Sequence, residues 1–144
     1  MYKALDIAKY IIWYSKQKNY SISNLKLQKI LYFIQADYIA NTSRLCFRDS
    51  IEAWDFGPVV SSIYGLYKIY GSAEIPYDGS NSIIKDIKLP DQKRIREIVD
   101  KCSKYSASTL VAITHKQAPW KLAYRRYENN EITPASIKEY FAKA

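Results

Sequence analysis

The residues best suited to chemistry are few and far apart in this chain. His115 is the single histidine, and no serine or cysteine nucleophile motif accompanies it. One histidine cannot supply a site that needs several imidazole ligands. Because His115 lies near the end of an expected helix and shortly before Trp120, we expect its imidazole to bond backbone groups left exposed at Pro119. Catalysis by His115 is the less favoured alternative.

Glu52 and Asp55 are the nearest approach to an acid–base pair. They lie three positions apart in an expected strand, where such side chains point to opposite faces. We therefore expect the two carboxylates not to converge. A structural role is favoured, in which Glu52 pairs with a basic group or accepts backbone N–H bonds beside Gly57 and Pro58.

The sequence offers no motif for a metal or a cofactor. Cys46 and Cys102 stand far apart and form no C-x-x-C or Cys/His cluster, and a chain with four glycines contains no phosphate-binding loop. We expect two buried free thiols, no catalytic residue, no cofactor-binding residue and no metal ligand. The chain is predicted not to be an enzyme.

Composition indicates one soluble domain. The 144 residues fit a single unit over 1–144, with 48% hydrophobic and 25% charged residues. No apolar run reaches the roughly 18 residues of a membrane helix, and charges interrupt what would be a signal sequence at the N-terminus. We therefore expect a cytoplasmic protein. The net charge of +8 favours acidic partners, either nucleic acid or an acidic protein surface, although solubility explains it equally well.

The elements that must position these residues are mostly helical. Apolar residues at helical spacing predict about six helices. They cover residues 4–18, 24–40, 58–70, a segment from Pro90, a segment from Ser106 or Ser108 that restarts at Pro119 and continues over 120–127, and residues 134–141. Short strands are predicted at Cys46–Phe47 and Ile51–Phe56, with an edge strand at Ser82–Leu89. The predicted fold is a mainly α, compact single-domain bundle with a small hairpin-like β element.

Several residues are predicted to begin or end these helices. Ser23 or Asn24 and Asp91 have suitable capping side chains, as does Thr133 before Pro134. Pro58 is predicted at the first position of the third helix, after the flexible Gly57. Gly71 is expected in the left-handed conformation after that helix.

Two aromatic and basic segments are candidate binding surfaces. Tyr64, Tyr67 and Tyr70 alternate with Ile63, Leu66 and Ile69, and these six cannot all be buried, so some rings should reach the surface beside Lys68.

The second segment runs from Trp120 to Tyr127. Trp120, Ala123, Tyr124 and Tyr127 share one helical face and should pack in the core, leaving Arg125 in solvent. Arginine beside aromatic rings also suits phosphate contact and base stacking, which is the nucleic-acid alternative.

Three motifs carry a family resemblance: Leu27–Tyr32, the string E-A-W-x-x-G-P-V at Glu52–Val59, and T-H-x-x-x-P-W-x-x-A at Thr114–Ala123. In these the chain resembles the Panacea domain, a bacterial and phage family that includes the SocA-like antitoxins. The resemblance implies a mainly helical antitoxin that neutralises a separately encoded toxin by direct contact. In the SocA-like branch it also implies a proteolytic adaptor that delivers the toxin to a Clp-type protease.

We therefore expect a non-enzymatic antitoxin whose partner is a toxin protein. The proposed contact residues are Tyr64, Tyr67, Lys68 and Arg125. The motif residues are interpreted as fold determinants, and they are Glu52, Trp54, Gly57, Pro58, His115 and Trp120. The alternative is a basic, nucleic-acid-binding transcriptional regulator, and a membrane partner is not expected.

Overall fold

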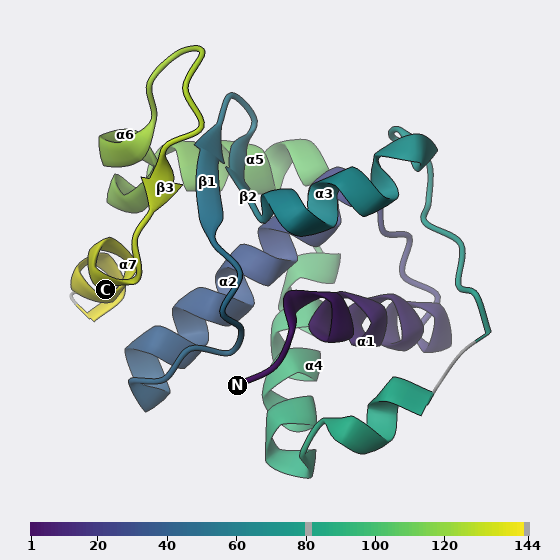
Figure 1. Cartoon of the computed structure of the whole chain (residues 1–144). Helices are drawn as coiled ribbons and strands as arrows, with labels where there is room; N and C mark the ends of the chain where they lie inside the picture. The colour runs from purple at the N-terminus through teal and green to yellow at the C-terminus, as the bar shows by residue number, and fades with distance from the viewer. Residues whose placement is uncertain (80–81, 143–144) are drawn as a thin grey trace.

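The computed structural model describes residues 1–79 and 82–142, which form a mainly helical domain with a small antiparallel sheet (Figure 1). In chain order the elements are α1 (Ala4–Gln17), α2 (Asn24–Thr42), β1 (Ile51–Trp54), β2 (Gly57–Val59), α3 (Ser61–Tyr67), the 3-10 helices η1 (Lys68–Tyr70) and η2 (Ser82–Asp86), α4 (Leu89–Ser103), α5 (Ala107–His115), α6 (Ala118–Ala123), β3 (Glu131–Ile132) and α7 (Pro134–Ala142). This architecture confirms the predicted fold class.

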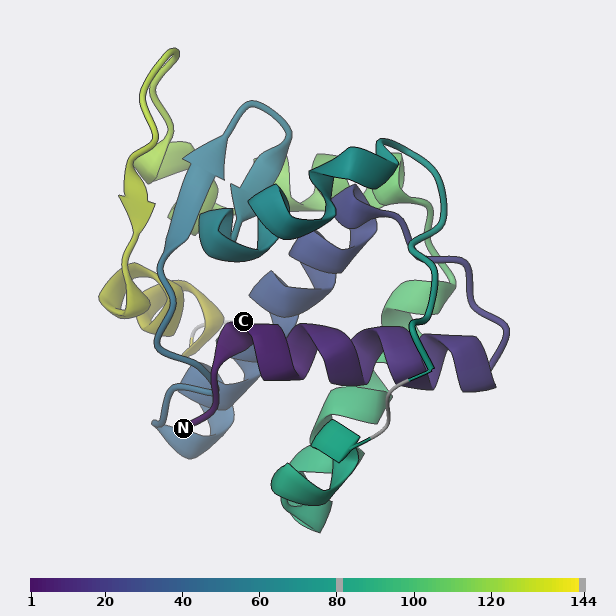
Figure 2. The same ribbon diagram turned by 45° about the vertical axis from the view of Figure 1, so that its right-hand side comes forward.

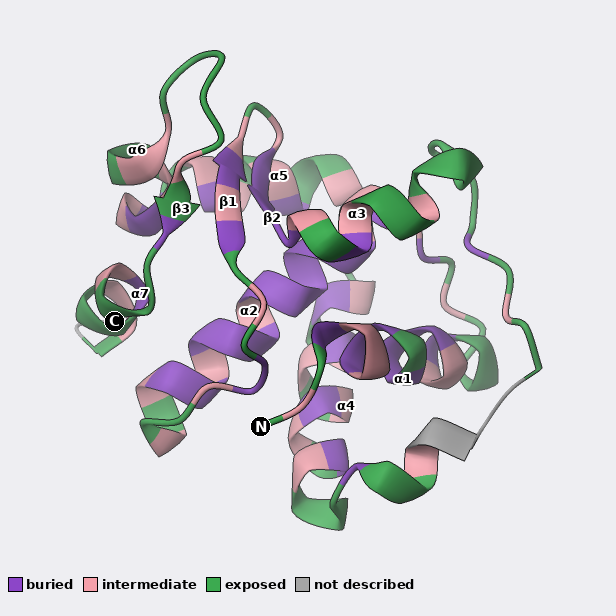
Figure 3. Ribbon diagram, viewed as in Figure 1, coloured by how far each residue is buried: buried purple, intermediate pink, exposed green. Residues whose placement is uncertain are grey.

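Helix α2 lies at the centre of the fold. It crosses the middle of the molecule and is buried along most of its length (Figure 3). Its apolar residues cover more than one face, as expected for a helix surrounded by other elements, and Leu27, Leu31 and Ile34 have no exposed surface. The predicted cap is present, because Ser23 Oγ accepts a hydrogen bond from the Lys26 N–H at 3.2 Å.

Buried polar side chains on α2 bind the backbone of the segments around it. Gln28 Oε1 accepts from the Val60 N–H at 2.9 Å, which fixes the entry to α3. Gln35 Nε2 donates to the Phe47 carbonyl oxygen at 2.7 Å, and its Oε1 accepts from the Cys46 N–H at 2.8 Å. These bonds satisfy backbone groups that would otherwise be buried without partners. The predicted strand at Cys46–Phe47 is therefore wrong, and Phe47 forms only an isolated bridge with Tyr2.

Helix α1 packs between α3 and α4, as the turned view shows (Figure 2). Tyrosine hydroxyls connect it to α4: Tyr14 donates to Asp100 Oδ1 at 2.9 Å, and Tyr10 donates to Gln92 Oε1 at 3.4 Å. The rings of these tyrosines pack against the core while their hydroxyls find polar partners, which is the amphipathic use expected of this residue.

The sheet has the strand order β2-β1-β3, and β1 pairs antiparallel with both neighbours. Pro58 lies opposite Ala53 in the edge strand β2, so its missing N–H does not interrupt a central ladder. The predicted helix start at Gly57–Pro58 is therefore wrong, and α3 begins at Ser61. Pairing with β1 outweighs the local preference of proline for the first turn of a helix.

Two predictions around α4 also fail. The segment Ser82–Leu89 is not a strand: η2 occupies Ser82–Asp86, and Gln92 Nε2 donates to the carbonyl oxygens of Ile84 and Ile87 in place of a strand partner. Asp91 does not cap α4. Its carboxylate instead accepts from the Tyr2 and Tyr38 hydroxyls at 2.5 and 2.6 Å.

The helix predicted over 120–127 ends early, at Ala123. Asn130 Nδ2 donates to the Ala123 carbonyl oxygen at 2.9 Å and so caps its end. Tyr127 lies beyond it with a φ of +66°, and its side chain is 90% exposed, so it does not join the predicted core face. Gly71 also differs from the expected left-handed conformation, since its φ is +57° but its ψ is −129°.

The last helix matches its prediction. Thr133 Oγ1 accepts from the Ser136 N–H at 3.1 Å, and α7 begins at Pro134. Cys46 and Cys102 are buried free thiols, as predicted. No helix in the described part of the chain is both long and apolar enough to cross a membrane.

Candidate partner-binding site

The three sequence motifs meet around Lys29. This residue lies on α2, Gly57 and Pro58 lie on β2, and Thr114 lies in the last turn of α5. Lys29 Nζ donates a hydrogen bond of 2.8 Å to the Pro58 carbonyl oxygen. Lys29 and Thr114 both lie against Gly57, and both are fully buried. The motifs therefore join three elements inside the fold.

Gly57 is the residue that this packing requires. Its φ of +102° is a conformation that L side chains seldom adopt. A Cβ at this position would lie 2.7 Å from Lys29 Cε and 2.8 Å from Thr114 Oγ1. The backbone of β2 can therefore approach α2 and α5 this closely only at a glycine.

Lys29 is a buried lysine without a counter-ion. Within the described residues no carboxylate lies at ion-pair distance from its Nζ, and the Phe56 ring centroid is 5.8 Å away. Burial lowers the pKa of Lys29 from 10.5 to about 7, because removal from water disfavours the charged form. A neutral amine is a nucleophile, but a side chain with no exposed surface cannot meet a substrate. Its role is therefore to hold β2 against α2.

Trp54, Glu52 and Trp120 connect the sheet to its neighbours. Trp120 Nε1 donates to the Trp54 carbonyl oxygen at 2.7 Å. Trp54 Nε1 donates to Glu52 Oε1 at 2.8 Å, and Ser61 Oγ donates to Glu52 Oε2 at 3.3 Å. Glu52 thus binds an indole and a hydroxyl in place of the basic or backbone partner that we predicted. Asp55 has a different partner, the Tyr124 hydroxyl, so no acid–base pair forms.

His115 packs through its ring. It stacks on Trp120 with ring centroids 4.0 Å apart and an interplanar angle of 24°. Its Nε2 is buried and has no hydrogen-bonding partner in the described structure. The predicted bonds to the backbone at the Pro119 break are absent there, because those groups bond one another: the Gln117 N–H donates to the Thr114 carbonyl oxygen at 3.1 Å, and the Lys121 N–H donates to that of Gln117 at 3.1 Å.

The four predicted contact residues fall in two separate regions. Tyr64 and Tyr67 are half-buried on α3, and Tyr64 packs on Trp54 with ring centroids 4.9 Å apart. Lys68 is exposed on η1. Arg125 is exposed on the loop between α6 and β3, which projects from the other end of the sheet region (Figures 1 and 2). A partner that contacted all four would have to span both regions.

The aliphatic residues beside these tyrosines are more exposed than the rings. Leu66 is 54% exposed and Ile69 is 83% exposed, whereas Ile63 is buried. This confirms that the six alternating residues are not all buried. Tyr70 is 39% exposed, so one ring reaches the surface as predicted. Tyr64 and Tyr67 are less exposed because they face the sheet and the core.

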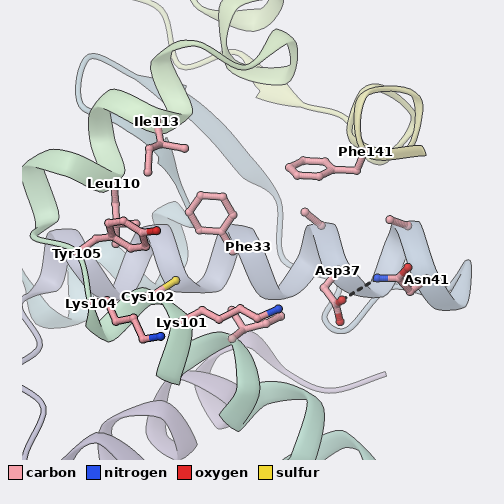
Figure 4. Close-up of a pocket in the computed structure, with 13 residues that line it drawn as sticks. Phe33, Asp37, Asn41, Lys101, Cys102, Lys104, Tyr105, Leu110, Ile113 and Phe141 are labelled. Carbon is pink, nitrogen blue, oxygen red and sulfur yellow. Dashed lines mark hydrogen bonds between the residues drawn. The ribbon is translucent and has the colours of Figure 1, made fainter. Parts of the chain in front are cut away.

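An open groove of about 510 Å³ lies between α2, α4, α5 and α7 (Figure 4). Phe33 on α2, Leu110 and Ile113 on α5, and Phe141 on α7 point into it. Most of this lining is apolar. The sequence pattern did not identify this groove, because each of the four helices contributes only part of it.

The polar margin of the groove is mainly cationic. Lys101 and Lys104 line it from the end of α4, and both are exposed. Asp37 lies on the same side of the groove, beyond Lys101 (Figure 4), where Arg94 forms an ion pair with it at 2.8 Å and Asn41 donates to it at 2.8 Å. The carboxylate is therefore neutralised within the protein, and the two lysines are left to face a partner.

No group of three or more histidine, cysteine or acidic residues in the described ranges could hold a metal ion. Burial raises the pKa of both thiols, that of Cys46 to about 12 and that of Cys102 to about 11. Neither is activated as a thiolate nucleophile at neutral pH.

Comparison with known proteins identifies the family of the chain. The chain belongs to the family described as Antitoxin SocA-like, Panacea domain, which matches residues 27–121. Antitoxin SocA of Caulobacter vibrioides (strain NA1000 / CB15N) is 33% identical to the chain, with 69% of the chain and 58% of that protein covered. The chain thus spans somewhat more than half the length of this curated relative. No solved structure matches the chain significantly. These findings confirm the resemblance drawn from the sequence motifs.

Proposed function

We propose that this protein is an antitoxin that acts in the cytoplasm and neutralises a separately encoded toxin by direct protein–protein contact. The observation that carries the proposal is the open apolar groove with two lysines that form no ion pair within the described residues, on a domain of the SocA-like antitoxin family. Exposed apolar surface that is bordered by polar residues is typical of protein-binding sites.

The chemistry of the motif residues supports binding over catalysis. Lys29 is inaccessible, His115 is stacked on Trp120, and Glu52 is held by neutral donors. No pair among these residues is arranged as nucleophile and base. The family motifs thus account for the stability of the domain, and its surface is left to determine the partner.

Two further regions are proposed as contacts that extend the binding surface. One includes Tyr67 and Lys68, next to the exposed Leu66 and Ile69, and the other includes Arg125. Tyr64 would support the first region from beneath, since its ring packs on Trp54. Aromatic and arginine side chains are frequent anchors in protein interfaces.

The test is co-expression with the product of the adjacent gene. That product alone is expected to arrest growth, and expression of this protein is expected to restore it. A tagged copy of this protein should then retain the product in a pull-down. A harmless product, or rescue without any complex, would contradict neutralisation by direct contact.

A proteolytic-adaptor role, with a Clp-type protease as a further partner, is a finer form of the same proposal. It predicts that the amount of toxin in the rescued cells falls, and that the fall disappears when the Clp protease is deleted. A constant amount of toxin during rescue would leave sequestration as the mechanism and would contradict delivery to the protease.

Nucleic-acid binding is a second candidate, favoured by one surface feature. The loop after α6 exposes Arg125, Arg126 and Tyr127, and the Arg126 guanidinium lies 4.9 Å from the Tyr127 ring centroid. Such a loop can contact phosphates and bases. This alternative predicts DNA affinity that falls steeply with salt and is lost in an Arg125→Ala, Arg126→Ala variant. The absence of binding near physiological salt would contradict it.

A further inference from the structure

We propose that the groove between α2, α4, α5 and α7 receives an amphipathic helix of the toxin that carries acidic residues beside its apolar face. This inference rests on the proposed antitoxin function and specifies which surface is used and which chemistry it recognises. It assigns the main contact to a surface separate from Tyr64, Tyr67, Lys68 and Arg125.

The apolar part of the groove fits a row of side chains from one helix face. Phe33 and Ile113 form its middle, Leu110 borders one end, and Phe141 borders the other (Figure 4). These residues come from three helices, so the groove is a channel between helices and not the edge of a sheet. A partner strand would find no unpaired backbone there, whereas a helix can bury residues at positions i, i+3, i+4 and i+7.

The charges select an acidic partner. Lys101 and Lys104 stand at the margin with no ion pair in the described part of the chain, and the nearby carboxylate of Asp37 is already paired with Arg94. The local charge available to a partner is therefore positive, in agreement with the net charge of +8. Carboxylates beside the apolar face of the incoming helix would complement it and speed association.

The same charges disfavour a second copy of this chain as the occupant. In a two-fold symmetric interface each patch meets its own copy. Lys101 and Lys104 of the two copies would then approach one another, and the carboxylate of Asp37 in the same lining is already paired with Arg94. A basic partner segment is disfavoured for the same reason.

The test measures the affinity of this protein for the purified product of the adjacent gene. The variant Lys101→Glu, Lys104→Glu removes the positive margin without touching the core. We expect it to weaken binding at least tenfold at low ionic strength, with the difference shrinking as salt is added. A second variant, Ala40→Trp, places a large ring at the Phe141 end of the groove and is expected to weaken binding tenfold or more at any salt concentration.

A matched control carries the same change in charge away from the groove. Lys85 and Lys93 are exposed lysines near the opposite end of α4. Compared at physiological salt, the Lys85→Glu, Lys93→Glu variant should bind within about threefold of the wild type, because charges more than a Debye length of about 8 Å from the contact are then largely screened. Circular dichroism and thermal melting establish that all three variants are folded.

Peptides from the same product identify the bound segment. Overlapping peptides that cover its sequence should include one acidic, amphipathic peptide that gains helicity on binding and that competes with the whole protein. The Lys101→Glu, Lys104→Glu variant should also bind this peptide more weakly.

The outcomes separate the two proposals. A tight complex that both groove variants leave unchanged would overturn the groove inference and leave the antitoxin function standing. A self-association lost in the same variants, without any effect on toxin binding, would assign the groove to a second copy and also overturn the inference. The absence of any complex between the wild-type proteins would overturn the proposed function, and the groove inference with it.

Discussion

Lys29 Nζ donates a hydrogen bond to the Pro58 carbonyl oxygen, 2.8 Å away, from a position with no exposed surface. This contact joins the first two sequence motifs, and Thr114 from the third motif packs against the same turn of chain at Gly57. The three sequence motifs of the family thus meet at one buried junction between α2, β2 and α5.

Replacement of Gly57 should destabilise the protein strongly. In Gly57→Ala the new methyl group meets Lys29 Cε and Thr114 Oγ1, and its backbone keeps a φ of +102°. We expect a loss of about 2–4 kcal/mol in the free energy of unfolding, from overpacking and backbone strain together. Urea denaturation measures it.

Gly65→Ala is the matched control for this prediction. Gly65 lies in α3, and a methyl group added there would meet no atom within 4 Å. Alanine at this position should raise stability by about 0.5–1 kcal/mol, because it is the better helix former. Equal effects of the two substitutions would contradict the close packing at Gly57.

The buried Lys29 should make stability depend on pH above neutrality. Its pKa is about 7 in the folded protein and 10.5 in the reference state, so between these values the unfolded chain holds a proton that the folded chain has lost. Stability attributable to Lys29 therefore rises with pH from about 7, by at most about 1.4 kcal/mol per pH unit. Below pH 7 both states are protonated, and the full cost of the buried charge is present.

The comparison with Lys29→Met isolates this effect. Methionine keeps the length of the side chain but cannot be charged, so the rise in unfolding free energy between pH 7 and pH 9 should be smaller in the variant. The absolute stability of the variant also reflects the lost bond to Pro58, which costs about 1–3 kcal/mol. The slope with pH is therefore the quantity to compare, and parallel slopes would contradict a lowered pKa at Lys29.

His115 should be replaceable by another aromatic ring. In His115→Phe the stack on Trp120 is retained and the buried Nε2 without a partner is removed. We expect stability to be unchanged or higher by up to about 1 kcal/mol, whereas His115→Ala should cost about 1–2 kcal/mol through the lost ring contact. Thermal melting distinguishes them, and a phenylalanine variant less stable than the alanine variant would refute a packing role.

Charge reversal at Lys68 and at Arg125 tests the two outer contact regions separately. Each side chain is exposed, so Lys68→Glu and Arg125→Glu should leave thermal stability within about 0.5 kcal/mol of the wild type. Each should weaken toxin binding modestly, by about two- to fivefold, as expected of charges at the margin of an interface. Unchanged affinity in either variant removes that region from the proposed surface.

Helix boundaries governed by local chemistry were predictable from the sequence. Ser23 and Ser106 cap their helices through side-chain oxygens, and Thr133 does so before Pro134. Each of these hydrogen bonds joins residues three positions apart, so both partners can be read from a short stretch of sequence. The repeat of apolar residues in α1 and α2 identified the core helices for the same reason.

Contacts between distant segments account for the failures. Pro58 follows a glycine and precedes an apolar helix, a pattern that favours a helix start, yet pairing with Ala53 places it in an edge strand. Asp91 was expected to cap α4, but Tyr2 and Tyr38 draw its carboxylate away. In each case the deciding partner comes from another element.

The candidate site was harder to predict than the fold. Lys29 was overlooked because a lysine is ordinarily solvent-exposed. A usable signal existed, since α2 carries apolar residues on more than one face, and a polar residue within such a helix must be buried too. No sequence pattern indicates the groove, because Phe33, Ile113 and Phe141 come together only when their helices are packed.

The most direct test of the antitoxin function is a calorimetric titration of this protein with the purified product of the adjacent gene, at physiological salt and without DNA or protease. Direct neutralisation predicts saturable binding with a defined stoichiometry and a complex that remains intact on gel filtration. The absence of binding, for a product that this protein nevertheless renders harmless in cells, would contradict neutralisation by direct contact.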